Sequence, residues 1–311
     1  MSAETLEISV VVPVFNEEEN VDELYRRCTK ALSQITPAFE ILCVDDGSSD
    51  STFTKLSQLH YQDSRLKVIT LSRNFGHQPA LLAGLSEARG RHIAIIDGDL
   101  QDPPEMIQKL YEQLIDHNYD VAYAIRTKRK EGLLKKAAYW FFYRLLGYLS
   151  QSTIPLDSGD FCIMKRKVLQ EMLHMPEQSL FLRGIRSWVG FRQIGVEIER
   201  SERQEGTPKY NLKKLTNLAL NGIFSFSNLP IKFLAWLGLF VMIFSILYAV
   251  YLLISKFVYN TVPEGFTTLI LLLFLLSGVQ LLAMGILGEY IARIYQESRR
   301  RPLFIIDKKL Q

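Results

Sequence analysis

Short apolar runs alternate with amphipathic segments between residues 7 and 125 of this 311-residue chain. The runs are rich in β-branched residues and have the length of strands, whereas the segments between them have the period of helices. This alternation predicts βαβ units and an α/β fold with a mainly parallel sheet. The expected strands are Ile8–Pro13, Glu40–Val44, Leu66–Leu71, His92–Ile96 and Val121–Ile125, and the expected helices are Glu17–Gln34, Ser51–His60, Pro79–Ala88 and Pro104–Asp116.

A second pattern begins near residue 231, where long apolar runs replace the alternation. Phe233–Ile254 contains no charged residue, and at ~1.5 Å per residue it would form a helix of ~33 Å, which matches the ~30 Å core of a bilayer. Phe266–Gly288 is also uncharged, and the connecting Ser255–Gly265 is too short for a domain. The sequence therefore predicts a transmembrane hairpin over residues 231–292.

Basic residues predict the orientation of this hairpin. The turn contains only Lys256, whereas many basic residues flank the two apolar runs. By the positive-inside rule, we expect a multi-pass protein of the inner (plasma) membrane with both termini, including the tail of residues 293–311, in the cytoplasm. The flanking basic residues are Lys213, Lys214, Lys232, Arg293, Arg299, Arg300, Arg301, Lys308 and Lys309.

Two further segments, residues 131–150 and 209–228, combine lysines with closely spaced aromatic residues and leucines. Helices of this kind suit the interface plane of a membrane. The alternative is that they pack in the soluble core, since buried helices share the same periodicity. We expect a cytosolic domain over residues 1–208 and an interfacial region over residues 209–230.

Composition excludes several classes of protein. The net charge of +3 at pH 7 gives no sign of nucleic-acid binding. Cys28, Cys43 and Cys162 lie far apart and form no C-x-x-C pair, which argues against a disulfide framework and against a thiolate metal site. The N-terminus lacks a basic n-region, so we expect no signal peptide. The histidines form no H-E-x-x-H pair that would indicate zinc, and His77 is only a weak candidate for the site.

Polar side chains cluster where the predicted strands end. In parallel sheets, ligands bind beyond the carboxyl ends of the strands. No G-x-G-x-x-G follows the first strand and no G-x-x-x-x-G-K-[ST] occurs, which disfavours both a dinucleotide site and a P-loop. The polar residues at the strand ends are Asn16 with Glu17, Asp45 with Asp46, Arg73 with Asn74, and Asp97 with Asp99.

The stretch DGDLQD crowds Asp97, Asp99, Gln101 and Asp102 behind an aliphatic strand. Carboxylates this close need a cation or a positively charged partner to hold them together. Asp97 and Asp99 can reach one hard cation, with Gln101 as a neutral oxygen donor. Because Mg²⁺ prefers a few carboxylates together with waters and substrate phosphates, the cluster predicts a divalent metal whose shell is completed by a pyrophosphate.

The polar residues at two other strand ends indicate a binding role less specifically. Asn16 together with Glu19 can form a helix N-cap and capping box, or it can belong to the site beside Glu17. Asp45 and Asp46 can each accept a hydrogen bond from a base imide or a ribose hydroxyl.

The motifs of the chain occur in the order VVPVFNEE, VDDGSSD, LSRNFGHQPALLAG, DGDLQDPPE, SGDF and the stretch from Arg203 through Gly206 to Lys209-Tyr210. Together they resemble the glycosyltransferase family 2 enzymes that act on polyprenyl phosphates, which include dolichyl-phosphate mannose synthase-like proteins and, more closely, bactoprenol glucosyltransferases. The resemblance covers nearly the whole chain, hairpin included. It implies a GT-A fold (a Rossmann-like, mainly parallel sheet), a nucleotide-sugar donor, Mg²⁺ or Mn²⁺, and inversion at the anomeric carbon.

The resemblance also implies roles for individual residues. Arg126 and Lys135 would hold the acceptor phosphate, and Arg203 and Lys209 fit a later R-x-x-G-x-[ST]-K pattern, from which the chain departs at Pro208. The nucleoside pocket would be lined by Pro13, Asn16, Glu17, Asp45 and Asp46, and the metal and diphosphate would be bound by Asp97, Asp99 and Gln101.

We expect Asp157 and Asp160, in LDSGDF, to lie nearest the reacting centre, with Asp99 as a third residue needed for catalysis. The two aspartates of LDSGDF can act as a base, a sugar-hydroxyl ligand or a cation pair; alternatively they form a local turn.

The expected reaction is transfer of a hexose, best glucose from UDP-glucose, to polyprenyl (undecaprenyl) phosphate at the cytosolic membrane face. GDP-mannose and a UDP-amino sugar are alternative donors. A processive polysaccharide synthase is a rival, although Arg186-Ser187-Trp188 lacks the leading Gln of Q-x-x-R-W. A non-catalytic membrane scaffold or lipid carrier is another, because fold alone never proves activity. The expected partners are the donor, the lipid and the membrane, and the oligomeric state is left open between a single copy and a homo-oligomer.

Overall fold

The structure is a computed structural model that describes residues 6–126, 158–175, 177, 180–198, part of 234–254, and 265–311. The predicted interfacial segments lie outside these residues, as do Lys135, Asp157, Arg203 and Lys209.

The chain divides into two compact units. The first comprises Met1–Gly147, Ser152–Lys209 and Arg301–Gln311, and the second comprises Tyr148–Gln151 and Tyr210–Arg300. The first unit therefore contains both the N-terminal part of the chain and its last residues.

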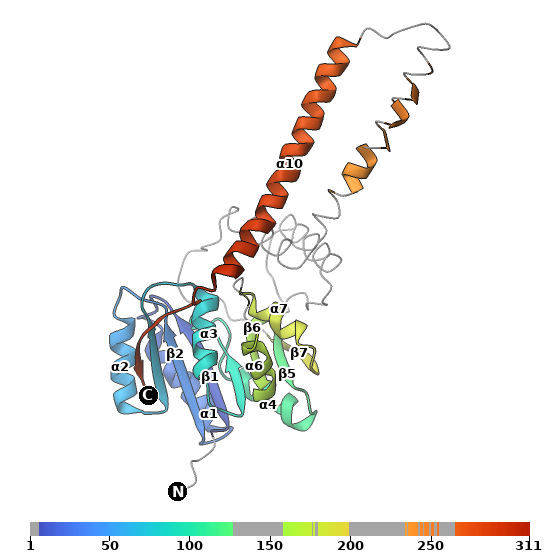
Figure 1. Ribbon diagram of the computed structural model, residues 1–311. Coiled ribbons are helices and arrows are strands. Elements are labelled where there is room, and N and C mark those ends of the chain that lie inside the picture. Colours follow the sequence, from blue (N-terminus) through green and yellow to red (C-terminus); the bar gives the residue numbers. More distant parts are fainter. Residues whose placement is uncertain are drawn as a thin grey trace. The chain divides into compact units, whose positions relative to one another are not determined.

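An eight-stranded sheet forms the centre of the first unit in its described part, with the order β7-β5-β6-β4-β1-β2-β3-β8 (Figure 1). β1 to β4 are parallel to one another, and β5 is parallel to β7. β6 is antiparallel to both of its neighbours, and β8 is antiparallel to β3. The strands are β1 Ile8–Val14, β2 Phe39–Asp45, β3 Leu66–Leu71, β4 His92–Ile95, β5 Val121–Arg126, β6 Ser158–Lys165, β7 Gln193–Ile198 and β8 Ile306–Leu310.

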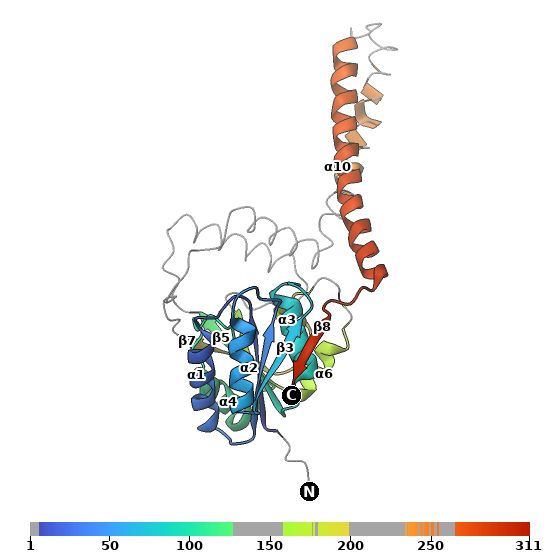
Figure 2. The same ribbon diagram turned by 90° about the vertical axis from the view of Figure 1, so that its left-hand side faces the viewer.

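Helices cover both faces of this sheet (Figures 1 and 2). Buried side chains of α1, α2 and α4 pack against one face, and those of α3, α6 and α7 pack against the other. Because both faces are covered, every residue of β1 and β2 is buried, as expected for central parallel strands. The helices are α1 Val21–Ser33, α2 Thr52–Gln62, α3 His77–Glu87, α4 Met106–Asp116, α6 Arg166–Leu173 and α7 Leu182–Trp188.

The mainly parallel sheet confirms the predicted fold, and the five predicted strands match β1 to β5 within one or two residues. The sequence pattern did not reveal β6, β7 and β8. β8 is five residues long and carries charged residues in its centre, so it lacks the apolar alternation of a strand. The first predicted helix also begins too early, because α1 starts at Val21 rather than at Glu17.

In the second unit, α10 extends from Phe266 to Arg299. The prediction ended this helix at Gly288, where the charge-free run stops, but the helix continues beyond it. Arg293 and Glu289, four residues apart, form an ion pair of 2.9 Å that supports the added turns. The residues that the structure describes between 234 and 254 are helical as well.

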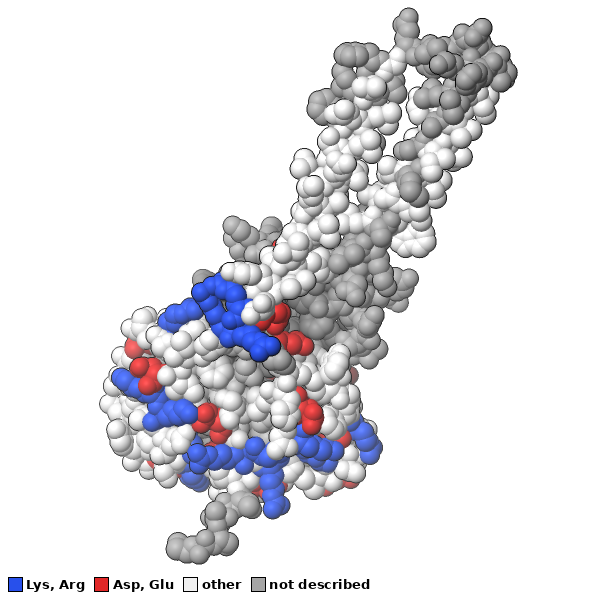
Figure 3. Space-filling model, in the orientation of Figure 1, with Lys and Arg blue, Asp and Glu red and all other residues white. Residues whose placement is uncertain are grey.

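Within the described part of the chain, no helix combines the length and the apolarity that a membrane crossing requires. The last turn of α10 and the residues after it carry exposed arginines at positions 299–301. Figure 3 shows basic side chains gathered at this end of the helix.

The C-terminal tail is a strand of the sheet in the first unit. β8 pairs with β3 in the register Val68↔Leu310 to Leu71↔Ile306, with an irregularity between Thr70 and Leu71. Lys309 also forms an ion pair of 2.7 Å with Glu87 at the end of α3. β8 therefore covers the edge of β3, which would otherwise present unpaired backbone groups.

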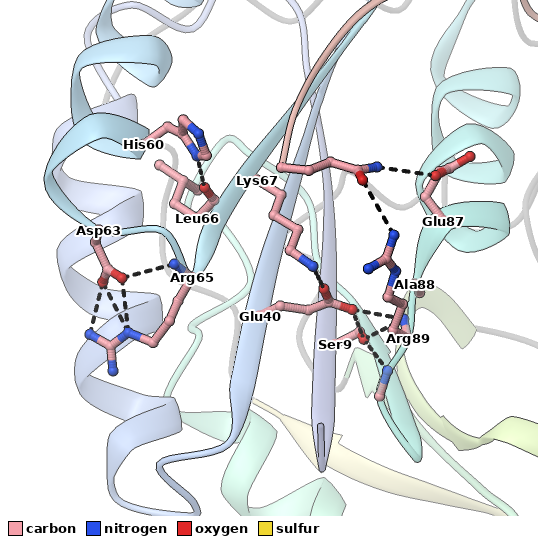
Figure 4. A network of polar contacts seen from close by, with 12 residues as sticks. Ser9, Glu40, His60, Asp63, Arg65, Leu66, Lys67, Glu87, Ala88 and Arg89 are labelled. Carbon is pink, nitrogen blue, oxygen red and sulfur yellow. Dashed lines mark hydrogen bonds and ion pairs between the residues drawn. The ribbon is translucent and has the colours of Figure 1, made fainter. Parts of the chain in front are cut away.

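Glu40 centres a buried polar network near the amino ends of β1 to β3 (Figure 4). Its side chain is 1% exposed and accepts hydrogen bonds from the Ser9 hydroxyl and the Lys67 ammonium, both at 2.5 Å. It also accepts the backbone N–H of Arg89 at 2.7 Å, just beyond α3. The network thus ties the chain after α3 to three neighbouring strands.

Replacement of Glu40 by Ala should lower the free energy of unfolding by about 3 kcal/mol, because it leaves the Lys67 ammonium without its acceptor. The change also removes the acceptor of the Ser9 hydroxyl and leaves the backbone N–H of Arg89 with Ser9 Oγ alone. The matched control is Glu105→Ala. Glu105 pairs with Arg27 but is half exposed, so its loss should cost less than about 1 kcal/mol. Denaturant unfolding of both variants measures the difference, and equal effects would contradict the assignment of Glu40 as a structural anchor.

Candidate active site

The carboxyl ends of β1, β2 and β4 meet at one edge of the sheet because these strands are parallel. β6 runs in the opposite direction beside β4, with Cys162 opposite Ile95. The amino end of β6, and with it Asp160, therefore reaches the same edge as Asp97, which follows β4. The antiparallel strand brings a residue from far along the chain into the site that the parallel strands build.

Asn16 connects the loop after β1 to the loop after β2. Its backbone N–H donates to the Ser48 hydroxyl at 3.0 Å, and its side-chain oxygen accepts the N–H of Ser49 at 2.9 Å. Asn16 has a φ of 53°, in the left-handed region. The interpretation of Asn16 as the N-cap of the first helix is wrong, since Asn20 holds that position. The carboxylate of Glu17 accepts a hydrogen bond from the Asn20 amide at 2.6 Å.

Asp45 and Asp46 are both buried at the end of β2, but their surroundings differ. Burial raises the pKa of Asp45, although the carboxylate accepts the N–H of Ser48 at 3.0 Å. The two oxygens of Asp46 accept the backbone N–H groups of Phe75 and Gly76 at 2.7 and 2.9 Å. Asp46 therefore fixes the loop that leads into α3, a contact that the sequence did not reveal.

Two glycines allow the loops at this edge to approach closely. A Cβ on Gly47 would lie 2.7 Å from the backbone carbon of Arg73, and Gly47 has a φ of +70°. A Cβ on Gly98 would lie 2.9 Å from the carbonyl oxygen of Pro13. Pro13 is thus a buried residue of β1 whose carbonyl contacts the loop that carries Asp97 and Asp99. Only glycine permits both contacts without a shift of the backbone.

Asp99 organises the acidic loop locally. Its Oδ1 accepts the backbone N–H of Gln101 at 3.2 Å, and the intervening Leu100 has a φ of 57°. Asp99 and Gln101 are both partly exposed. This turn keeps the side chains of Asp99 and Gln101 accessible to a ligand.

His77, the first residue of α3, lies between two carboxylates. Its Nε2 is 3.6 Å from Asp97 Oδ1 and 3.5 Å from Asp160 Oδ2. Burial alone would lower the pKa of His77, but the hydrogen bond with Asp160 and the charges of both carboxylates raise it overall. His77, a weak candidate from the sequence, is therefore in contact with two predicted site residues.

The surroundings of Asp97 disfavour the charged form of its carboxyl group. Burial raises its pKa to about 6; His77 opposes this shift, while the nearby carboxylates of Asp160, Asp102 and Asp99 add to it. Its Oδ1 is buried without a hydrogen-bond partner. A buried anion with an unsatisfied oxygen is costly unless another positive charge arrives.

Asp160 is 6% exposed and is held by Arg183 of α7. Arg183 Nε donates to Oδ1 at 2.7 Å and its Nη2 donates to Oδ2 at 3.1 Å. Burial would raise the pKa of Asp160, but the hydrogen bonds and charges of His77 and Arg183 outweigh it and hold the pKa below its ordinary value. Two carboxylates that share the histidine thus have opposite pKa shifts.

The remaining predicted residues stay predictions. Arg126 is the last residue of β5, at the same edge of the sheet. Lys135, Asp157, Arg203 and Lys209 belong to the part of the chain that the structure does not describe. Sequence reasoning assigned no role to Gln78, although it lies within LSRNFGHQPALLAG, and no quoted motif contained Arg183. Their roles arise from the packing of α3 and α7 beside β6.

The described residues include no group of three or more His, Cys, Asp or Glu side chains placed to hold a metal ion. Mg²⁺ commonly takes only one or two protein carboxylates and completes its shell with waters and substrate phosphates. Asp97 has an unsatisfied buried oxygen and a raised pKa, and Asp99 lies two residues away in a partly exposed turn. These residues fit a cation that is shared with a diphosphate.

Comparison with known proteins places this arrangement in a family. The family described as Glycosyl transferase family 2 matches residues 9–173, which include every strand end discussed above. The chain belongs to glycosyl transferase family 2. It is a glycosyltransferase with a GT-A fold, and residues 229–294 match the GtrB C-terminal hairpin.

Curated relatives align over almost the full length. An uncharacterized glycosyltransferase of Bacillus subtilis (strain 168), YkcC, is 43% identical over 97% of this chain and 94% of its own length. The bactoprenol glucosyl transferase of Shigella phage SfV is 41% identical over 98% of this chain and 100% of its own. Among solved structures, glucosyl-3-phosphoglycerate synthase from Mycobacterium tuberculosis has a TM-score of 0.48 at 18% identity, covering 70% of this chain and 76% of that one.

Asp97→Asn should stabilise the metal-free protein at pH 7.5 by about 1–3 kcal/mol. The folded-state pKa of about 6 lies above the ordinary aspartate pKa of 3.8. The folded state therefore binds the proton more tightly, and stability falls as the pH rises between these values. Asparagine removes that cost, and the advantage over the wild type should vanish below about pH 4.

Thermal unfolding in the presence of a chelator, at pH 7.5 and again below about pH 4, measures this difference in stability. Asp116→Asn, the same change at an exposed residue in α4, should leave stability unaltered. A loss of stability in Asp97→Asn at pH 7.5 would instead mean that Asp97 has a structural role.

Proposed function

We propose that this glycosyltransferase transfers glucose from UDP-glucose to a polyprenyl phosphate, with inversion at the anomeric carbon. The observation that carries the proposal is the full-length alignment with proteins named bactoprenol glucosyl transferase, hairpin region included. The buried, unsatisfied oxygen of Asp97 at the edge of the sheet supports a donor that brings a cation with it.

The main task of the site is to let two anionic phosphates approach each other. A lipid monophosphate with a second pKa of about 6 is largely dianionic at neutral pH, so it needs little help from a general base. We assign the acceptor phosphate to Arg126, Lys135 and Arg203, with Lys209 close by in the sequence. Asp157 and Asp160 stay candidates for groups near the reacting carbon.

On the donor side, Pro13, Asn16, Glu17, Asp45 and Asp46 are our candidates for the nucleoside pocket. The rigid contacts of Asn16 and Asp46 with neighbouring loops support a pocket that is formed before the donor arrives.

Asp97, Asp99 and Gln101 would hold Mg²⁺ or Mn²⁺. When bound, such an ion would neutralise charge that develops on the leaving nucleotide diphosphate.

The lipid acceptor also requires a place at the membrane. The match of residues 229–294 to a GtrB-type hairpin supports membrane association. Our proposal is that the hairpin spans the inner (plasma) membrane, that the interfacial segments lie on its surface, and that the catalytic unit and both termini face the cytoplasm.

Purified full-length protein tests the proposal when it is supplied with a short polyprenyl phosphate and, in separate reactions, UDP-glucose, GDP-mannose or UDP-N-acetylglucosamine. Of the three donors, only UDP-glucose should give nucleotide release together with a glucosyl lipid. A chelator should abolish both the release of UDP and the formation of the lipid product. Preference for another donor would overturn the assignment of the sugar. Donor hydrolysis without a glycolipid product would overturn the assignment of the acceptor.

Asp99→Asn should lower the turnover by about 10²-fold or more, because Asp99 would hold the metal ion whose charge stabilises the transition state. Asp116→Asn serves as the control and should retain wild-type turnover. Product is quantified by mass spectrometry of the lipid fraction. Unchanged turnover of Asp99→Asn would refute the metal assignment, whichever sugar is transferred.

A further inference from the structure

Helix α7 supplies a guanidinium group to the site, and the geometry of that contact is specific. Two nitrogens of Arg183 bind the two oxygens of Asp160, at 2.7 and 3.1 Å. Bidentate pairs of this kind fix the plane of the carboxylate as well as its position. Because Asp160 is 6% exposed while the Arg183 side chain is 32% exposed, the acid is held from the solvent side by the arginine.

Gln78 links this pair to α3. Its side-chain amide nitrogen donates to Asp160 Oδ2 at 3.4 Å, and its side-chain oxygen accepts the backbone N–H of Leu182 at 3.0 Å. Gln78 therefore contacts both the acid and the first residue of α7. The beginnings of α3 and α7 are held together around the carboxylate of Asp160.

The consequence is that Asp160 has a single orientation relative to His77 and Asp97. Oδ2 faces His77 Nε2 at 3.5 Å, and the same nitrogen lies 3.6 Å from Asp97 Oδ1. The groups follow one another as Arg183, Asp160, His77 and Asp97, with charges that alternate when the histidine is protonated. A shift of the arginine would be transmitted along this row to the donor side of the site.

We propose that Arg183 is a positioning residue for the transfer reaction, which acts through Asp160 and, with Gln78, fixes that carboxylate opposite His77 and Asp97. This inference rests on the proposed transferase function, but it does not depend on which sugar is transferred. It adds α7 to the elements that build the site, although no sequence motif in α7 identified Arg183.

The alternative is direct contact between Arg183 and a substrate phosphate, and a double-mutant cycle separates the two. The variants are Arg183→Met, Asp160→Asn and the double variant, assayed with whichever nucleotide sugar the wild type turns over fastest. If Arg183 acts through Asp160, Arg183→Met should lower kcat by about 10²-fold with the KM for the donor nearly unchanged. The double variant should then be no slower than Asp160→Asn within about threefold.

Arg183→Lys provides the conservative rescue. It keeps the charge but loses the two-pronged contact, so its kcat should fall between those of the wild type and Arg183→Met, at about a tenfold loss. The matched control is Arg192→Met, because Arg192 is an exposed arginine that stacks on Tyr119 and contacts neither Asp160 nor His77 in the described structure. Its kcat and KM should equal those of the wild type.

Three outcomes overturn the inference. Multiplicative losses in the double variant would show that Arg183 acts independently of Asp160. A large rise in KM for donor or acceptor would indicate direct substrate binding. A lower thermal midpoint with unchanged kcat per folded molecule would indicate a purely structural ion pair. In contrast, absence of turnover by the wild type with every donor would overturn the proposed function itself.

Discussion

Asp97 and the buried Asp160 place two carboxylates within reach of one imidazole, and the repulsion between them is the constraint around which this site is built. The fold compensates the charge of one carboxylate more completely than that of the other. Arg183 and His77 neutralise Asp160, whose pKa is held low, whereas Asp97 keeps an unsatisfied oxygen and a raised pKa. Groups whose surroundings push their pKa values apart commonly have different tasks in an active site. One acid is fixed by protein contacts, whereas the other retains an oxygen without a hydrogen-bond partner.

The surrounding loops are tied to one another by hydrogen bonds. Asn16 ties the first loop to the second, and Asp46 ties the second to the third through two backbone N–H groups. Gly47 and Gly98 permit the close approach that these contacts need. A site organised in this way loses little conformational freedom when a ligand binds, which favours affinity and orientation.

The sequence predicted the parts of this molecule whose signals are local. The β-branched runs identified β1 to β5 to within one or two residues, and the D-x-D spacing identified the acidic loop. Asn16 shows where local reasoning failed, because an asparagine that caps a helix and one that connects two loops have the same local sequence signature. Arg183 shows why the rest could not be predicted. Its partner Asp160 is 23 residues away, and only the antiparallel course of β6 makes them neighbours.

The return of the C-terminus to the sheet has a consequence for how the protein is made and shortened. β8 follows residues 229–294 in the chain, so the β3 edge lacks this partner during synthesis until β8 has been made. A truncated protein that ends before the hairpin would lack β8 altogether and expose the β3 edge to pairing with other chains, with aggregation as the expected result. In terms of connectivity, the second unit is an insertion into the first rather than an appendage to it.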